Sequence, residues 1–217
     1  MTWRRTGELL LPRDSVPEWA RPVADFASAA DVSAITRFAP SPGTGRHAAV
    51  LILLGDTPDV VLVERATGDA LHSGQPAFPG GVVESRDRDA VDAALREAEE
   101  EIGLDRAGVT PFALLPDLWI PVSDLVVSPV LAWWHAPAEI GVRDSREISA
   151  VHRIPIADLA AGDNRCRVQH PSGYVAPGFA VSSMLVWGFT AGILDALLRG
   201  AGWEEPWDSA RVLTLPG

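Results

Sequence analysis

The stretch that decides the fold runs from residue 78 to residue 104 and reads FPGGVVESRDRDAVDAALREAEEEIGL. It joins a turn, Phe78-Pro79-Gly80-Gly81, to a segment with many helix-forming residues and a cluster of glutamates near its end. Paired glycines permit positive φ angles and a close approach of the backbone, which lets a turn aim its amides at an anion. The combination predicts a site where a divalent metal and a phosphate chain meet.

The second half of this stretch is predicted to be a helix from about Asp89 to Ile102, which Gly103 ends. Its apolar residues recur at i, i+3, i+4, i+7 and i+11, so one side of the helix should pack on a sheet. This stripe consists of Val91, Ala94, Leu95, Ala98 and Ile102.

The glutamates of this helix are the candidate metal ligands. Glu97, Glu100 and Glu101 stand at i, i+3 and i+4, so we expect their carboxylates within one turn, on an exposed face away from the apolar stripe. Arg96 offsets part of their repulsion by reaching Glu100 at i+4. The simpler interpretation is a solvated acidic face. A hard cation such as Mg²⁺, which takes carboxylate oxygens, water and phosphate as ligands, would balance the remaining charge.

Composition narrows the class of partner. The chain has 217 residues and a formal charge of -11, from 29 acidic residues against 18 basic ones, all of them arginine. Binding to a nucleic-acid backbone needs a basic surface, so we expect no nucleic-acid partner. The single cysteine, Cys166, cannot form an internal disulfide, and no stretch has the uninterrupted apolar length of a membrane span. We therefore expect a cytoplasmic protein without a membrane partner.

The rest of the pattern predicts one domain with mixed elements. Residues 1–45 are interpreted as an N-terminal helical extension that packs on the core, and residues 46–217 as the main domain with a C-terminal helix. The predicted strands are 48–54, 60–65, 112–115, 125–134 and 147–156, and the other predicted helices are 17–28, 157–161 and 190–200. A turn at 57–59 should join the first two strands as a hairpin. Strands mixed with few helices predict an α/β sandwich around a mixed β-sheet.

The segment from Arg96 to Leu104 resembles the second half of the Nudix box, Arg-Glu-aliphatic-x-Glu-Glu-x-Gly-aliphatic, with Ala98 in the aliphatic position. The first half departs from the general pattern, because Arg88 stands where a glutamate is expected and the spacing from the glycine is one residue longer. The Nudix subgroup of coenzyme A diphosphatases is similar in this longer spacing. Its acidic residues correspond to Glu84, Asp87 and Asp89.

The residues before the glycine turn also resemble that subgroup. Arg65, Gly74 and the turn itself are in register with its upstream signature, whereas Ala70 replaces an arginine and Pro76 replaces a valine. The resemblance implies a Nudix-type α/β/α sandwich, Mg²⁺ or Mn²⁺ as cofactor, a coenzyme A-like nucleotide as substrate, and a homodimer.

The resemblance also assigns roles in hydrolysis of a diphosphate bond. Glu97 and Glu101 would bind the metal, and Glu100 would be a further ligand or the base that takes a proton from the attacking water. Arg96 would orient these carboxylates, and Glu84 would supply another metal contact. A base can also come from a later loop, where Glu147 is the first candidate, ahead of two neighbouring acids, Glu139 and Asp144.

Substrate contacts are expected from Arg65, Gly80 and Gly81, and from Tyr174 in a turn-rich loop. Two alternatives stay open. The same chemistry would serve ADP-ribose, a dinucleotide or a nucleoside triphosphate. The chain would instead be a nucleotide-binding module without catalysis if Arg88 marks a lost site, although the complete Arg96-Glu97 and Glu100-Glu101 pairs argue against that.

Overall fold

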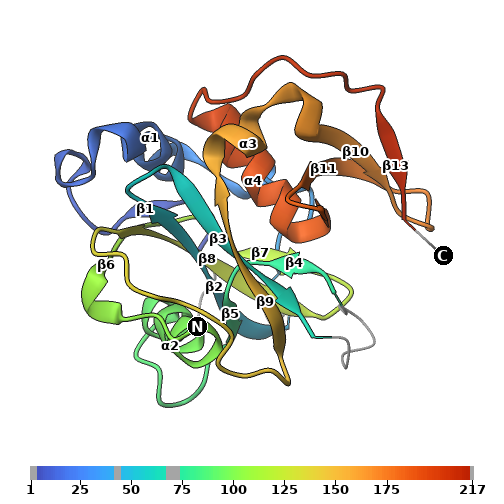
Figure 1. Cartoon of the computed structure of the whole chain (residues 1–217). Helices are drawn as coiled ribbons and strands as arrows, with labels where there is room; N and C mark the ends of the chain where they lie inside the picture. Colours follow the sequence, from blue (N-terminus) through green and yellow to red (C-terminus); the bar gives the residue numbers. More distant parts are fainter. Residues whose placement is uncertain (1–3, 42–44, 67–73, 216–217) are drawn as a thin grey trace.

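Two β-sheets and four α-helices form the part of the chain that the computed structural model describes, residues 4–41, 45–66 and 74–215 (Figure 1). The larger sheet contains β1 (Glu8–Leu9), β2 (Arg46–Gly55), β3 (Asp59–Arg65), β4 (Pro76–Ala77), β5 (Gly80–Val82), β6 (Val109–Leu114), β7 (Leu118–Ile120), β8 (Leu125–Trp134) and β9 (Ile148–Pro155). The smaller sheet contains β10 (Arg165–Gln169), β11 (Val175–Val181), β12 (Met184–Val186) and β13 (Val212–Thr214). The helices are α1 (Arg21–Ala29), α2 (Ala90–Ile102), α3 (Ile156–Ala160) and α4 (Gly188–Gly200).

The larger sheet is mixed, as predicted. β2 and β8 lie parallel at its centre, in register from Arg46 beside Leu125 to Gly55 beside Trp134. The pairs on either side of this centre are antiparallel: β6 runs against β8, and β9 runs against β3. Figure 1 shows α2 on one side of this sheet and α1, α3 and α4 on the other. This arrangement confirms the α/β/α sandwich.

Side chains of the central strands alternate between two cores. On β2, Leu51 and Leu53 pack in the cluster that includes α2, whereas Ile52 and Leu54 pack in the cluster that includes α1 and α4. All four are at most 2% exposed. A strand covered on both faces needs a continuous apolar run, which explains why residues 48–54 contain no polar side chain.

The predicted hairpin of 48–54 and 60–65 is wrong beyond its base. β2 and β3 pair only at Leu54 and Val60, and β3 then runs beside β9. The other end of β2 pairs with β5, where Ala49 lies opposite Gly81. The segment with the two glycines therefore pairs with the part of β2 that β3 does not contact. The turn is covered at this position, since Phe78, Pro79 and Gly80 are all buried.

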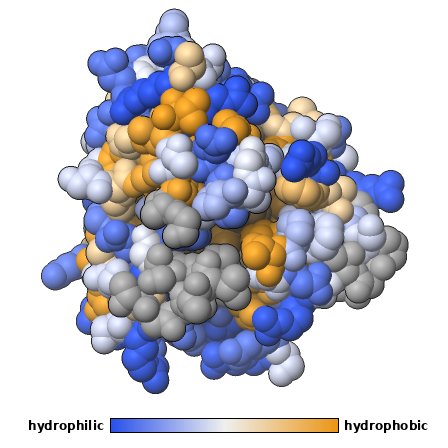
Figure 2. Space-filling view, turned by 90° about the vertical axis from the view of Figure 1, so that its right-hand side faces the viewer, coloured by the Kyte–Doolittle hydropathy of each residue, from blue (hydrophilic) through white to orange (hydrophobic). Residues whose placement is uncertain are grey.

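The smaller sheet was not predicted. Its strands are short, and Pro177 and Gly178, which are typical of turns, lie inside β11. Its parallel pair, β10 with β13, joins the segment near residue 167 to the last described residues. Figure 2 shows the side of the molecule that lies on the right in Figure 1, where apolar residues gather mainly in the upper half among charged ones.

The N-terminal segment packs on the body of the molecule. Val23, Ala24 and Ala27 of α1 belong to the same core cluster as α4, and β1 pairs with the β6 edge of the larger sheet. The division at residues 45 and 46 stays a prediction. Among the described helices, none combines the length and the apolar character that crossing a membrane would require.

Helix α2 begins after Asp89, whose carboxylate accepts a hydrogen bond from the Asp92 amide, and ends at Gly103. The expected stripe is partly correct: Ala94, Ala98 and Ile102 are fully buried, with Ala93, while Val91 and Leu95 are half-buried. The expected exposure of Glu101 is wrong, because only 3% of this residue is accessible. One carboxylate of the acidic helix therefore lies on the inner side, under the glycine turn.

Candidate functional site

The glycine turn lies directly against the acidic helix. Gly80 has a φ of 154°, and a Cβ there would lie 2.3 Å from the Ala49 carbonyl oxygen. A Cβ on Gly81 would lie 2.5 Å from Oε1 of Glu97. Gly80 therefore requires glycine for its conformation and for space, whereas a side chain at Gly81 would displace the Glu97 carboxylate. The close approach puts the Gly80 amide beside the carboxylate of Glu101.

Arg96 is the centre of the ion-pair network. Its Nε and Nη2 donate to both carboxylate oxygens of Asp87, at 2.8 and 2.9 Å, and Nη2 also donates to the Val82 carbonyl. Its Nη1 donates to Glu97 at 2.9 Å and to Glu100 at 3.1 Å. The side chains of Arg96 and Asp87 are 7% and 2% exposed. The expected contact with Glu100 is therefore present, and Arg96 holds the acidic helix to the turn that precedes it.

Asp87 is the principal anchor of Arg96. The Arg96 hydrogen bonds lower the pKa of the Asp87 carboxyl to about 2. The Glu84 amide also donates to Asp87, which closes a tight turn before the helix. From the sequence, Asp87 has no expected role beyond its place in the resemblance, because its pairing with Arg96 depends on how that turn folds back.

Glu101 is a buried carboxylate with few partners. Its Oε2 accepts a hydrogen bond from the Gly80 amide at 3.1 Å. Burial raises the pKa of the Glu101 carboxyl to about 8, although the nearby charge of Arg65 acts in the opposite direction. Burial also raises the pKa of Glu97, against the effect of Arg96. Carboxylates that resist ionisation in this way are groups that a bound cation would stabilise in the charged form.

The outer carboxylates of the site share a second arginine. Arg86 places Nε 2.9 Å from Glu84 and Nη2 3.0 Å from Glu100. All three side chains are about half exposed, between 49 and 60%. Arg96 and Arg86 thus both contact Glu100, one from the inner side and one from solvent. Glu99 points elsewhere, toward Arg106.

The structure also brings Arg65 and Glu147 toward the acidic helix. Glu147 accepts a hydrogen bond at its carbonyl from the Ala66 amide, next to Arg65 at the end of β3. The charges of both residues act on Glu101: Arg65 lowers its pKa and Glu147 raises it. The loop before Glu147 is held by the end of α2, where the Arg143 amide donates to the Glu101 carbonyl. Unpaired carbonyls at a helix C-terminus are ready acceptors for such a loop.

Tyr174 lies in a different part of the fold. It belongs to the turn between β10 and β11 in the smaller sheet and is 45% exposed. The guanidinium carbon of Arg37 lies 4.8 Å from the centroid of its ring. The contacts that describe Tyr174 do not join it to the acidic helix. Its role in substrate binding stays a prediction.

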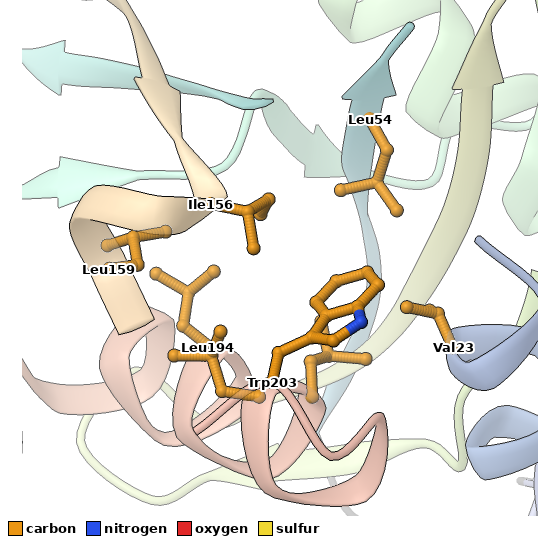
Figure 3. Close-up of a pocket in the computed structure, with 8 residues that line it drawn as sticks. Val23, Leu54, Ile156, Leu159, Leu194 and Trp203 are labelled. Carbon is orange, nitrogen blue, oxygen red and sulfur yellow. The ribbon is translucent and has the colours of Figure 1, made fainter. Parts of the chain in front are cut away.

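A separate apolar pocket lies between α1, α3, α4 and β2, with Val23, Leu54, Ile156, Leu194 and Trp203 around it (Figure 3). Every side chain that lines it is hydrophobic. A diphosphate needs cations and amides, and this pocket supplies neither. The acidic helix and the glycine turn remain the candidate site.

Comparison with known proteins gives the family. The NUDIX domain model matches residues 44–171, more than half of the chain. The chain belongs to the Nudix family. It is 36% identical over 168 residues to the uncharacterized Nudix hydrolase NudL of Escherichia coli K12, a match that covers 72% of this chain and 83% of NudL. NudL of Shigella flexneri serotype 5b is 35% identical over 172 residues, covering 74% and 85%. The chain is therefore a Nudix hydrolase.

Solved Nudix structures are more distant. RenU, a Nudix hydrolase of M. smegmatis, matches with a TM-score of 0.49 and 18% identity, covering 76% of this chain and 91% of RenU. In this Nudix hydrolase, the residues that resemble the Nudix box form β5, the turn at 84–87 and α2.

Nudix hydrolases typically depend on a divalent metal, and the residues of this site fit one in their chemistry. Glu97, Glu100 and Glu101 offer hard oxygen ligands, and the burial of Glu101 leaves a carboxylate with little compensation. Within the described ranges, however, no three acidic, histidine or cysteine side chains are gathered into a ready metal cage. The arginines explain the difference from the predicted cluster: Arg96 holds Glu97 and Glu100, and Arg86 holds Glu100 from outside.

Arg88 does not block the Nudix site. Its side chain is 83% exposed and pairs with Asp92 in the first turn of α2. Asp87, one residue earlier, has a buried side chain that accepts a hydrogen bond from Arg96. The longer spacing of the box therefore keeps an acidic residue in contact with its central arginine.

Proposed function

We propose that this Nudix hydrolase cleaves the diphosphate bond of coenzyme A or an acyl derivative, with Mg²⁺ or Mn²⁺ as cofactor. The products would be 3′,5′-ADP and 4′-phosphopantetheine or its acyl form. The observation that carries the proposal is the one-residue-longer box, in which Asp87 is bound by Arg96 through two hydrogen bonds. That spacing is the feature that resembles coenzyme A diphosphatases.

The reaction is hydrolysis of a phosphoanhydride. The oxygen of a water molecule forms a bond to one phosphorus, the bond from that phosphorus to the bridging oxygen breaks, and the bridging oxygen leaves on the other phosphate. The proton of the water passes to a carboxylate, for which Glu100 and Glu147 are the two candidates. Bound Mg²⁺ or Mn²⁺ would neutralise the charge of the diphosphate and hold the attacking water.

The residues of the box have two further proposed roles, which are to hold the metal and to position its ligands. Glu97, Glu100 and Glu101 would hold the metal, with Glu84 as a further ligand. Arg96 fixes Glu97 and Glu100 relative to the turn. Positioning of this kind matters because a nucleophile must approach in line with the leaving oxygen.

Substrate contacts would come from other residues. Gly80 and Gly81 are the proposed contacts of the turn with a phosphate, and Arg65 supplies a positive charge close to Glu101. Tyr174 is the proposed contact for a more distant part of the substrate.

The test is incubation of the purified protein with coenzyme A and MgCl₂, with both products identified by mass. We expect equal amounts of 3′,5′-ADP and 4′-phosphopantetheine, and no products in EDTA. An enzyme that leaves coenzyme A and its acyl forms intact would refute the substrate assignment.

A second candidate keeps the chemistry and changes the substrate to ADP-ribose, a dinucleotide or a nucleoside triphosphate. Pro76, a departure from the coenzyme A signature, is buried in β4 and pairs with Glu64. Ala70, the other departure, lies outside the described residues. A panel of these substrates at equal concentration, compared by kcat/KM, separates the two candidates.

The third reading, a nucleotide-binding module without catalysis, is disfavoured by the position of Arg88. This side chain points to Asp92 and leaves the carboxylates of the box unobstructed. Hydrolysis of any member of the panel excludes it. The homodimer expected from the resemblance is a further proposal, which sedimentation velocity would test.

A further inference from the structure

Arg86 occupies the solvent side of the carboxylate cluster. It lies in the turn between the glycines and α2, one residue before the buried Asp87. From there its guanidinium spans two carboxylates that are sixteen residues apart, Glu84 at 2.9 Å and Glu100 at 3.0 Å. Nothing in the Nudix pattern quoted above requires a cation at this position.

The two arginines of the site differ in how firmly they are held. Arg96 has a 7% exposed side chain and bonds to three carboxylates and a carbonyl. Arg86 is 60% exposed, and its two partners are about half exposed. Exposed ion pairs of this kind are weak and are screened by salt. Arg86 is therefore the cation of the site that can be displaced.

Its two partners, Glu84 and Glu100, are both proposed to bind the metal. A divalent ion that takes these carboxylates meets the positive charge of Arg86 at the same oxygens. Two cations cannot share these oxygens without repulsion. The metal must either displace the guanidinium or bind beside it at a cost in affinity.

We propose that Arg86 is a tethered cation that competes with the divalent metal for Glu84 and Glu100 and thereby sets the metal affinity of this site. The inference rests on the proposed metal dependence. It makes Arg86 a positioning residue. The carboxylates stay neutralised when the metal is absent, and they are released to the metal when it binds.

The test measures metal binding directly, without substrate. Mn²⁺ is titrated into the EDTA-treated, dialysed protein, and the free ion is followed by its electron paramagnetic resonance signal. Calorimetry with Mg²⁺ gives a second measurement. The variants are Arg86→Gln, Arg86→Lys and Arg88→Gln. The last one removes the same charge from a neighbouring exposed arginine that pairs with Asp92 instead.

We expect Arg86→Gln to bind Mn²⁺ about three- to tenfold more tightly than the wild type in low salt, and the difference to shrink in 0.5 M KCl, about the range in which salt screens such charges. Arg86→Lys, which keeps the charge, and Arg88→Gln should stay within about twofold of the wild type.

Unchanged or weaker binding in Arg86→Gln would overturn the inference and leave the proposed function standing. An equal gain in Arg86→Lys or in Arg88→Gln would also overturn it, since the effect would then come from the side chain's shape or from net charge. If the wild type binds neither Mn²⁺ nor Mg²⁺, the proposed metal dependence fails, and the inference fails with it.

Discussion

Arg96 and Arg165 are both buried, 6% and 1% exposed, but their surroundings differ. Arg96 contacts three carboxylates, and a fourth, Glu101, lies under the same turn. Arg165 pairs with Asp195 and Glu204, while Arg199 also pairs with Asp195. The first network has an excess of negative charge, and the second is balanced.

The two arginines also differ in the side chains that pack around them, because aromatic rings cover Arg165. The guanidinium carbon of Arg165 lies 5.1 Å from the Phe179 ring centroid and 4.8 Å from that of Trp207. Aromatic faces stabilise a cation and close the site to water. Among the described residues, no aromatic ring is found over Arg96, and one of its partners, Glu100, has a side chain that is 49% exposed. A charge excess that is open to solvent can bind a further cation, whereas a balanced, closed network holds segments together.

The largest effect is expected from a change in the solvent-open network around Arg96. Changing Glu101→Gln removes a proposed metal ligand but keeps an oxygen that can accept from the Gly80 amide. We expect kcat to fall about a thousandfold, or about 4 kcal/mol of transition-state stabilisation. Steady-state hydrolysis of the best substrate in saturating Mg²⁺ measures this.

Glu99→Gln is the matched control, because Glu99 pairs with Arg106 on the same helix outside the cluster. Its activity should stay within about twofold of the wild type. Full activity in Glu101→Gln would remove this residue from the site.

The second largest effect is expected from a change in the closed network around Arg165. Changing Arg165→Met leaves Asp195 and Glu204 without their shared partner, and we expect the free energy of unfolding to fall by about 3 kcal/mol. Urea unfolding measures the loss. Below the unfolding transition, kcat should change little, because the proposed metal ligands lie on α2 and in the turn before it, outside this network.

Arg199→Met is the control for this variant. Arg199 is 52% exposed and bonds to the same Asp195, so its loss should be less than about 1 kcal/mol. A variant of Arg165 that keeps its stability but loses activity would contradict the division between the two networks.

The pH dependence of the free energy of unfolding tests the open network further, because it depends on the pKa of the buried Glu101. Its pKa rises from 4.5 in the reference state to about 8 in the folded protein. Between these values the folded state keeps a proton that the unfolded state has lost. The free energy of unfolding therefore decreases as the pH rises through this window, and levels off above the folded pKa.

In the metal-free protein we expect a loss of about 2 kcal/mol between about pH 5.5 and pH 7.5 from this group. Urea unfolding in EDTA at several pH values measures the slope. Glu101→Gln should show a flatter profile and should be the more stable protein near pH 8. Equal slopes in the two proteins would show that Glu101 titrates normally.

The smallest effect is stabilisation by the metal itself. Mg²⁺ at ten times its dissociation constant should add about 1.4 kcal/mol to the free energy of unfolding. Arg165→Met should retain this increment and Glu101→Gln should lose it. Thermal unfolding with MgCl₂, against KCl at the same ionic strength, tests the difference, and an increment that survives in Glu101→Gln would place the metal elsewhere.

Much of the larger sheet could be predicted from the sequence. The apolar runs of β2 and β8 and the helix between Asp89 and Gly103 follow from local patterns that the structure confirms. The smaller sheet could not be predicted in this way, because Pro177 and Gly178 interrupt its longest strand. Its pairing of β10 with β13 also joins residues more than forty positions apart.

The burial of Glu101 shows where local reasoning failed. Position 101 follows Ala98 by three residues and Ala94 by seven, so helical periodicity places it on the buried side. The prediction instead groups Glu101 with Glu97 and Glu100 on the exposed face. The glycine turn over the helix supplies the amide that a buried carboxylate needs, and that contact joins residues 21 positions apart.

The sequence by itself determined the Nudix box, the spacing of its glutamates on one helix and the need for a glycine turn, because helix geometry and backbone conformation are local. Only the tertiary structure decided which carboxylate is buried and which arginine holds each one. Asp87 meets Arg96, Arg86 bridges Glu84 and Glu100, and Ala66 holds the loop of Glu147. These contacts depend on how distant segments fold together, and electrostatic energy at short range depends on such distances and on burial.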